Sequence, residues 1–174
     1  MTSARAGPTS KSSFPAVADA RTRLLILGSL PGEISLAHAQ YYAHPRNQFW
    51  RLMEAVVERP LIDVDYAERL STLLAAGVGV WDVIASAERI GSLDTKIRNH
   101  EANALAEFAA TLPALRAIAF NGGKASSIGR KQLGSEPGYA LVTLPSSSPA
   151  HAAVPIERKH AEWQVLKNFL PGDA

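Results

Sequence analysis

Four short apolar runs alternate along this chain with segments whose apolar residues recur at helical spacing. The runs lie at residues 23–27, 79–84, 115–120 and 139–144. Short continuous runs are typical of strands buried on both faces, and helical segments between them indicate parallel strands joined by crossovers. We therefore expect an α/β fold, a three-layer α/β/α sandwich around a central, mostly parallel four-stranded sheet.

The helical period predicts five helices, at residues 49–58, 66–76, 102–112, 123–133 and 156–170. Pro60 and Pro113 end the first and third of these segments. In the last segment Ile156, Trp163 and Leu166 share one face, which indicates an amphipathic helix.

Composition limits the organisation and the location of the protein. A length of 174 residues suits one core, and we expect a single domain over residues 21–174. Residues 1–20 are rich in Ser, Ala, Pro and Thr, which predicts a flexible N-terminal tail. No apolar run approaches ~18 residues and no secretory pattern is visible, so we expect a cytoplasmic protein with no membrane span.

The absence of cysteine excludes disulfides, thiolate zinc sites and cysteine-held iron–sulfur clusters. A net charge of +2 is compatible with a nucleic-acid partner but does not by itself indicate one.

The segment between the first strand and the first long helix, residues 28–50, is unusually long for a connection. It runs to about twenty residues, beyond the ~12–15 at which a loop is usually functional or disordered. It contains two tyrosines, His44, Arg46 and Asn47 and is not of low complexity, so we expect a functional loop.

Polar or turn-rich residues follow each predicted strand. They are the long loop after the first strand, Asp82 near the end of the second, residues 121–124 after the third and residues 145–151 after the fourth. The carboxyl ends of parallel strands share one edge of the sheet, so these four segments predict a common pocket there.

Several chemistries lack their signatures. His44 and His151 have no acid at ligand spacing, and we expect neither a metal nor a cofactor. The GxSxG elbow and the full phosphate-loop pattern are absent. Ser148 and His151 remain open as a nucleophile and base of a small-molecule hydrolase.

Two motifs in the long loop resemble the uracil-DNA glycosylase superfamily, nearest to its mismatch-specific and hypoxanthine-DNA glycosylase branches. The first, G-x-x-P-G, is residues 28–32, and the second, an aromatic followed by A-H-P-x-N-x-F-W, is residues 42–50. The resemblance implies a fold of that family and hydrolysis of the N-glycosidic bond of a base flipped out of DNA. Its hypoxanthine branch implies hypoxanthine as the first substrate, with xanthine or uracil possible.

The resemblance also implies a water-positioning residue. Mismatch-specific relatives use an Asn at the third position of the first motif, where this chain has Leu30. The hypoxanthine branch instead uses the Asn of A-H-P-x-N, which is Asn47 here. Alternatively, Asn47 caps the helix that follows it, a position at which Asn is among the preferred residues.

Five further residues are expected to bind the base: Ser29, Gly32, Tyr42, Asp82 and Asn121. The resemblance implies that Tyr42 stacks on the base and that Asp82 and Asn121 contact its edge or the sugar. The alternatives are a core tyrosine, a buried acid bonded to backbone amides, and a turn residue in an Asn-Gly pair.

The second family motif falls at residues 146–151, where Ser146 replaces the usual Asn or His. Residues 149–152 are a candidate wedge into the DNA stack. Basic and hydroxyl residues near this edge are candidate DNA contacts: Arg46, Lys124, Ser147, Ser148 and His151, with Arg158 and Lys159 nearby.

The sequence therefore predicts a monofunctional, monomeric DNA glycosylase whose partner is DNA containing deaminated bases, associated with the nucleoid when bound. Two alternatives stay open: a noncatalytic module that binds damaged DNA or nucleotides, and an α/β small-molecule hydrolase.

Overall fold

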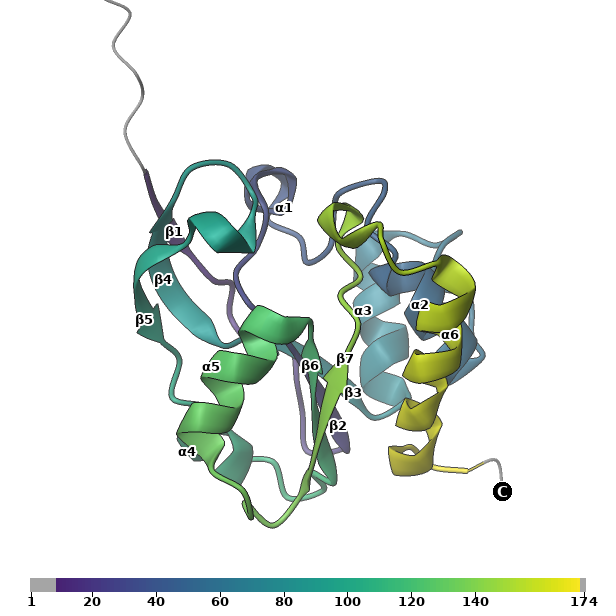
Figure 1. Cartoon of the computed structure of the whole chain (residues 1–174). Coiled ribbons are helices and arrows are strands. Elements are labelled where there is room, and N and C mark those ends of the chain that lie inside the picture. The colour runs from purple at the N-terminus through teal and green to yellow at the C-terminus, as the bar shows by residue number, and fades with distance from the viewer. Residues whose placement is uncertain (1–8, 173–174) are drawn as a thin grey trace, which may run out of the picture.

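The computed structural model describes residues 9–172 and contains a four-stranded parallel sheet with the strand order β3-β2-β6-β7 (Figure 1). Its strands are β2 (Leu24–Gly28), β3 (Val78–Asp82), β6 (Ala117–Asn121) and β7 (Ala140–Leu144). Each strand starts and ends within two residues of an apolar run in the sequence, so the predicted sheet is confirmed.

Helices cover both faces of this sheet (Figure 1). One face carries α2 (Phe49–Val57), α3 (Tyr66–Ala75) and α6 (Ile156–Trp163), and the other carries α4 (Leu105–Ala110) and α5 (Gly123–Leu133). In β2, Leu24 and Ile26 pack toward the first group, whereas Leu25 and Leu27 pack toward the second. This alternation follows from the two-residue period of a strand and gives the predicted three layers.

A second, antiparallel sheet was not predicted. It has the order β1-β4-β5 and is built from β1 (Thr9–Ser12), β4 (Ile84–Arg89) and β5 (Arg98–Ala102). Every side chain of β5 is exposed, so the segment has no apolar alternation from which a strand could be predicted. Strand β5 forms because its backbone pairs with β4.

The N-terminal segment differs from the expected tail from Thr9 onward, because it pairs with the body of the fold. Beyond β1, Val17 and Val80 exchange two backbone hydrogen bonds of 2.9 Å, and Phe14 packs edge-on against Tyr41. Residues 1–8 of the predicted tail lie outside the described residues.

The long loop after β2 contains a short helix, α1 (Glu33–His38), which begins directly after Gly32. Ala39 ends this helix in the left-handed conformation, and the chain then turns inward at the buried Tyr41. Within residues 9–172, none of the helices combines the length and apolar character that crossing a bilayer requires.

Candidate active site

An open cavity of about 550 Å³ lies at the carboxyl ends of the parallel strands. Its walls come from the segments that follow β2, β6 and β7 and from Asp82 at the end of β3, as the topology predicts, and also from the turn after β4. Ten of the predicted site residues line it: Ser29, Gly32, Tyr42, Asn47, Asp82, Asn121, Lys124, Ser147, Ser148 and His151. Arg46 is exposed outside this lining. The volume lies in the range of small-ligand pockets.

Asn47 lies where both of its predicted roles would place it. It lines the cavity, and its Oδ1 accepts the N–H of Phe49 at 3.0 Å at the start of α2. Its own N–H donates to the carbonyl of His44 at 2.9 Å. The hydrogen bond from the Phe49 N–H orients the Asn47 carboxamide. Because a carbonyl oxygen has two lone pairs, Oδ1 can still accept a second hydrogen bond.

Tyr42 lies beside Asn47 with its ring stacked on Phe49, the centroids 3.9 Å apart and the planes at 17°. Phe49 therefore covers one face of the ring. Tyr42 has a φ of +54°, an uncommon conformation for a bulky residue that is enriched at ligand sites. Its buried hydroxyl has no hydrogen-bond partner among residues 9–172.

Asp82 and Gly28 meet at the floor of the cavity. A Cβ atom on Gly28 would lie 2.7 Å from Asp82 Oδ1 and 3.1 Å from the Tyr42 hydroxyl, so any larger residue there would displace the Asp82 carboxyl group. Asp82 is 3% exposed, and its Oδ2 is unpaired within the described part of the chain.

The pKa of Asp82 is raised to about 7: burial is the main cause, the negative charge of Asp94 adds to the rise, and the positive charge of Arg89 opposes it. Both protonation states are therefore accessible near neutral pH. The protonated carboxyl donates a hydrogen bond, whereas the carboxylate only accepts.

Asp94 is a cavity residue that the sequence did not indicate. Its Oδ1 accepts the Ser29 hydroxyl at 2.7 Å, so the Ser29 side chain is held at the cavity wall. Burial raises the pKa of Asp94, while the Ser29 hydrogen bond and the charges of Arg89 and Lys124 lower it. Asp94 follows the unpredicted strand β4 in a polar segment with no motif, so no sequence signal distinguished it.

Asn121 and Ser147 pair with each other. The Asn121 Nδ2 donates to Ser147 Oγ, and its Oδ1 accepts the Ser147 N–H, both at 2.9 Å. Ser147 is fully buried, which differs from the expected phosphate contact, because a buried hydroxyl bonded to Asn121 cannot reach the DNA backbone. Asn121 keeps one amide hydrogen beyond this pair.

The loop after β7 is anchored from α6. Lys159, expected near the rim as a phosphate contact, is 1% exposed and donates to the His151 carbonyl at 3.0 Å and to Gln48 Oε1 at 2.9 Å. The indole of Trp163 donates to the Pro145 carbonyl at 3.0 Å. Lys159 therefore holds this loop against α6.

The side chains at the tip of this loop differ in their freedom. Ser148 Oγ accepts the Ala150 N–H at 3.2 Å, and the His151 side chain is exposed. Within residues 9–172, no group of three or more His, Asp or Glu side chains is arranged to hold a metal ion.

The fold and the cavity together define a class of protein: an α/β sandwich with an aromatic, amide-lined pocket at the carboxyl ends of its parallel strands. The sequence profile of the uracil DNA glycosylase superfamily matches residues 14–168. The chain belongs to this superfamily.

Individual relatives are similar over nearly their whole length. The chain is 40% identical to a hypoxanthine DNA glycosylase of Methanosarcina acetivorans, over 90% of this chain and 97% of the relative. It is 39% identical to that of Methanosarcina barkeri, over 90% and 98%. A solution structure of a candidate uracil DNA glycosylase from Methanosarcina acetivorans superposes with a TM-score of 0.82 at 38% identity, covering 92% of this chain and 99% of that one.

Proposed function

We propose that this protein is a DNA repair glycosylase that hydrolyses the N-glycosidic bond of deaminated bases, hypoxanthine first, and leaves an abasic site. The observation that supports this most directly is the placement of Asn47: the motif residue that the hypoxanthine branch uses lines the cavity with its carboxamide oriented. The similarity of the chain to two hypoxanthine DNA glycosylases over almost their full length supports the same substrate.

The chemistry requires one water molecule and a stabilised leaving group. The extruded nucleotide enters the cavity, and its base stacks on the face of Tyr42 that Phe49 leaves uncovered. Asn47 orients the water, whose oxygen bonds to C1′ of the sugar as the bond from C1′ to the base nitrogen breaks. The base leaves with the bonding electron pair and gains a proton, while the water loses one.

Polar groups at the floor are suited to the edge of the base. Asp82 Oδ2 and the Tyr42 hydroxyl are buried and unpaired among the described residues, a state that costs about 1–3 kcal/mol for each group. A base edge with donors and acceptors would satisfy both. Asn121 contributes its remaining amide hydrogen, and the Ser29–Gly32 segment contributes backbone groups.

The rim supplies candidate DNA backbone contacts. Lys124 is half-buried at the start of α5, whereas Arg46 and His151 are exposed. These side chains and the Ser148 hydroxyl are placed to bind phosphates on either side of the flipped nucleotide. We expect the protein to act as a monomer, and a DNA substrate supports a location in the cytoplasm with the nucleoid.

The proposal is tested with end-labelled DNA that contains one inosine, xanthine or uracil, incubated with the protein and then cleaved with alkali at abasic sites. We expect cleavage at inosine first and no strand break before the alkali step, since a hydrolase without a lyase step leaves the backbone intact. Uncut inosine DNA together with cut uracil DNA would assign the protein to uracil instead. Binding without any cleavage would assign it to a noncatalytic module.

A further inference from the structure

Three large apolar side chains are exposed at one edge of the cavity, across from the loop after β7. They are Ile34 (37% exposed), Ile90 (61%) and Leu93 (48%), here called the apolar edge. Ile34 and Leu93 line the cavity, and Ile90 lies in the same turn as Leu93. Exposed apolar groups that gather beside a binding site usually mark a contact surface.

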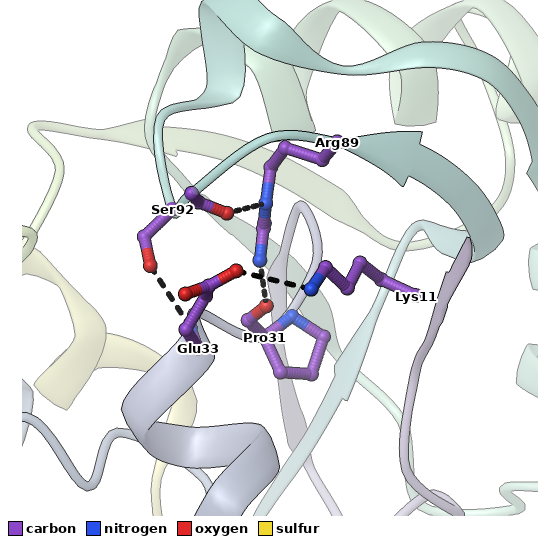
Figure 2. Close-up of polar contacts among 6 residues, drawn as sticks. Lys11, Pro31, Glu33, Arg89 and Ser92 are labelled. Atoms are coloured by element: carbon purple, nitrogen blue, oxygen red, sulfur yellow. Dashed lines mark hydrogen bonds and ion pairs between the residues drawn. The ribbon is translucent and has the colours of Figure 1, made fainter. Parts of the chain in front are cut away.

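The turn that presents Leu93 is tied to the first motif (Figure 2). Arg89, itself 1% exposed, donates to the Pro31 carbonyl at 2.5 Å and to the Gly91 carbonyl at 2.7 Å. The N–H of Glu33 donates to Ser92 Oγ at 2.9 Å. Lys11 from β1 pairs with the Glu33 carboxylate at 3.0 Å, so the antiparallel sheet and the first motif hold the turn from two sides.

Leu93 is exposed although both of its neighbours are anchored. Ser92 is bonded to Glu33, and Asp94 accepts the Ser29 hydroxyl at 2.7 Å. The Leu93 carbonyl itself accepts the N–H of Lys96 at 3.0 Å. A side chain on so constrained a backbone loses little conformational freedom when it inserts into a partner.

The opposite edge of the cavity has no comparable group. Residues 149–152 are Pro, Ala, His and Ala, and their 3-10 helix presents small side chains and one imidazole. A base pair that loses a nucleotide leaves a gap in the stack, and proteins that hold such gaps open insert Leu, Ile, Phe, Met or Pro. Leu93 has the required size and rigidity, whereas residues 149–152 include only a proline of that set.

We propose that Leu93 is the side chain that enters the DNA stack when the damaged nucleotide is extruded, with Ile90 and Ile34 packed against the adjoining groove. This inference rests on the proposed glycosylase function and reassigns the wedge from residues 149–152 to the turn after β4. The occupant is duplex DNA, because Leu93 and Ile34 border the cavity that receives the flipped base.

If Leu93 is a wedge, the effect of substituting it should differ between duplex and single-stranded substrates. Extruding a nucleotide from a duplex costs a few kcal/mol of unstacking and unpairing, whereas a single strand offers its bases almost freely. A residue that lowers only this cost affects duplex substrates and spares single strands. A residue that contacts the base or supports the fold affects both.

The experiment compares Leu93→Ala and Leu93→Phe with the unchanged protein on one inosine sequence, as a duplex and as a single strand. For Leu93→Ala we expect kcat/KM to fall about tenfold or more on the duplex and to stay within about twofold on the single strand. Leu93→Phe should retain most of the duplex activity. Ile62→Ala is the matched control, since Ile62 is 40% exposed and lies outside the cavity lining.

Equal losses on both substrates, or full duplex activity in Leu93→Ala, would overturn the inference while leaving the glycosylase assignment in place. If the unchanged protein cuts neither the duplex nor the single strand, both the wedge inference and the glycosylase assignment are wrong. Because Leu93 is exposed, Leu93→Ala should melt with the unchanged protein, and a circular dichroism melt verifies that each variant is folded.

Discussion

The carboxamide of Asn121 makes two hydrogen bonds to Ser147, both of 2.9 Å, which join the end of β6 to the loop after β7. The Ser147 carbonyl in turn accepts the N–H of Gln48 at 3.0 Å. One buried serine thus sets the spacing between Asn121 and the segment that carries Asn47. The geometry of the cavity therefore depends on this pair before any substrate binds.

Asn121→Ala should destabilise the protein by about 1–3 kcal/mol, because it leaves the buried N–H and Oγ of Ser147 without partners. Ser147→Ala is the matched control, since it removes one of the two bonds and leaves the other. Denaturant unfolding gives the stabilities, and glycosylase assays are run well below each midpoint. If Asn121 also contacts the base, its variant should lose far more activity than Ser147→Ala; equal losses would limit Asn121 to holding the loop.

The raised pKa of Asp82 predicts a pH-dependent stability. An acid whose folded pKa lies above its ordinary 3.8 weakens the fold as the pH rises from about 4 to about 7, because the unfolded chain releases the proton first. Asp82→Asn removes this penalty and should be more stable than the unchanged protein by about 1–4 kcal/mol near pH 8, the difference vanishing near pH 4. Urea unfolding at both pH values measures it.

A constant difference between these proteins at all pH values would mean that Asp82 does not titrate in this range. The activity profile provides a second check on the same group. An inflection near pH 7 in kcat/KM should disappear in Asp82→Asn if the protonation state of Asp82 matters to the base.

The central sheet was predictable because its strands are buried on both faces and therefore appear as continuous apolar runs. Their parallel topology placed Asp82, Asn121 and the long loop at one edge, which the structure has. Neither inference needed the order of the strands. The motif around Asn47 added the chemistry, which topology alone does not supply.

Elements held by pairing rather than by apolar burial were missed. Strand β5 exposes all its side chains, and the polar sequence of β1, TSKS, is typical of a tail rather than a strand. The cavity role of Asp94 was hidden with them, since that residue follows β4. Lys159 was expected at the surface because it is basic, although its position three residues after Ile156 and four before Trp163 puts it on the buried face of the helix.

If Asn47 orients the attacking water as proposed, Asn47→Ala should lower kcat/KM on inosine DNA by about 100-fold or more. It should also cost about 1 kcal/mol of stability through the lost bond to the Phe49 N–H. Asn47→Ser separates the effects, because a serine can still accept that N–H but has no carboxamide. We expect Asn47→Ser to melt near the unchanged protein and yet remain inactive; substantial activity in this variant would exclude a water-positioning carboxamide.

Lys159→Met tests the support beneath the loop after β7. The substitution keeps the unbranched apolar stem of the side chain but leaves Gln48 Oε1 and the His151 carbonyl without their donor, so we expect a loss of about 1–3 kcal/mol in urea unfolding. Arg158→Ala is the control, because that neighbouring cation is exposed and pairs with Glu162 at 3.1 Å, an interaction worth about 0.5 kcal/mol or less. If Lys159 bound phosphate instead, its variant would keep full stability and reduce the salt slope of DNA binding by about one.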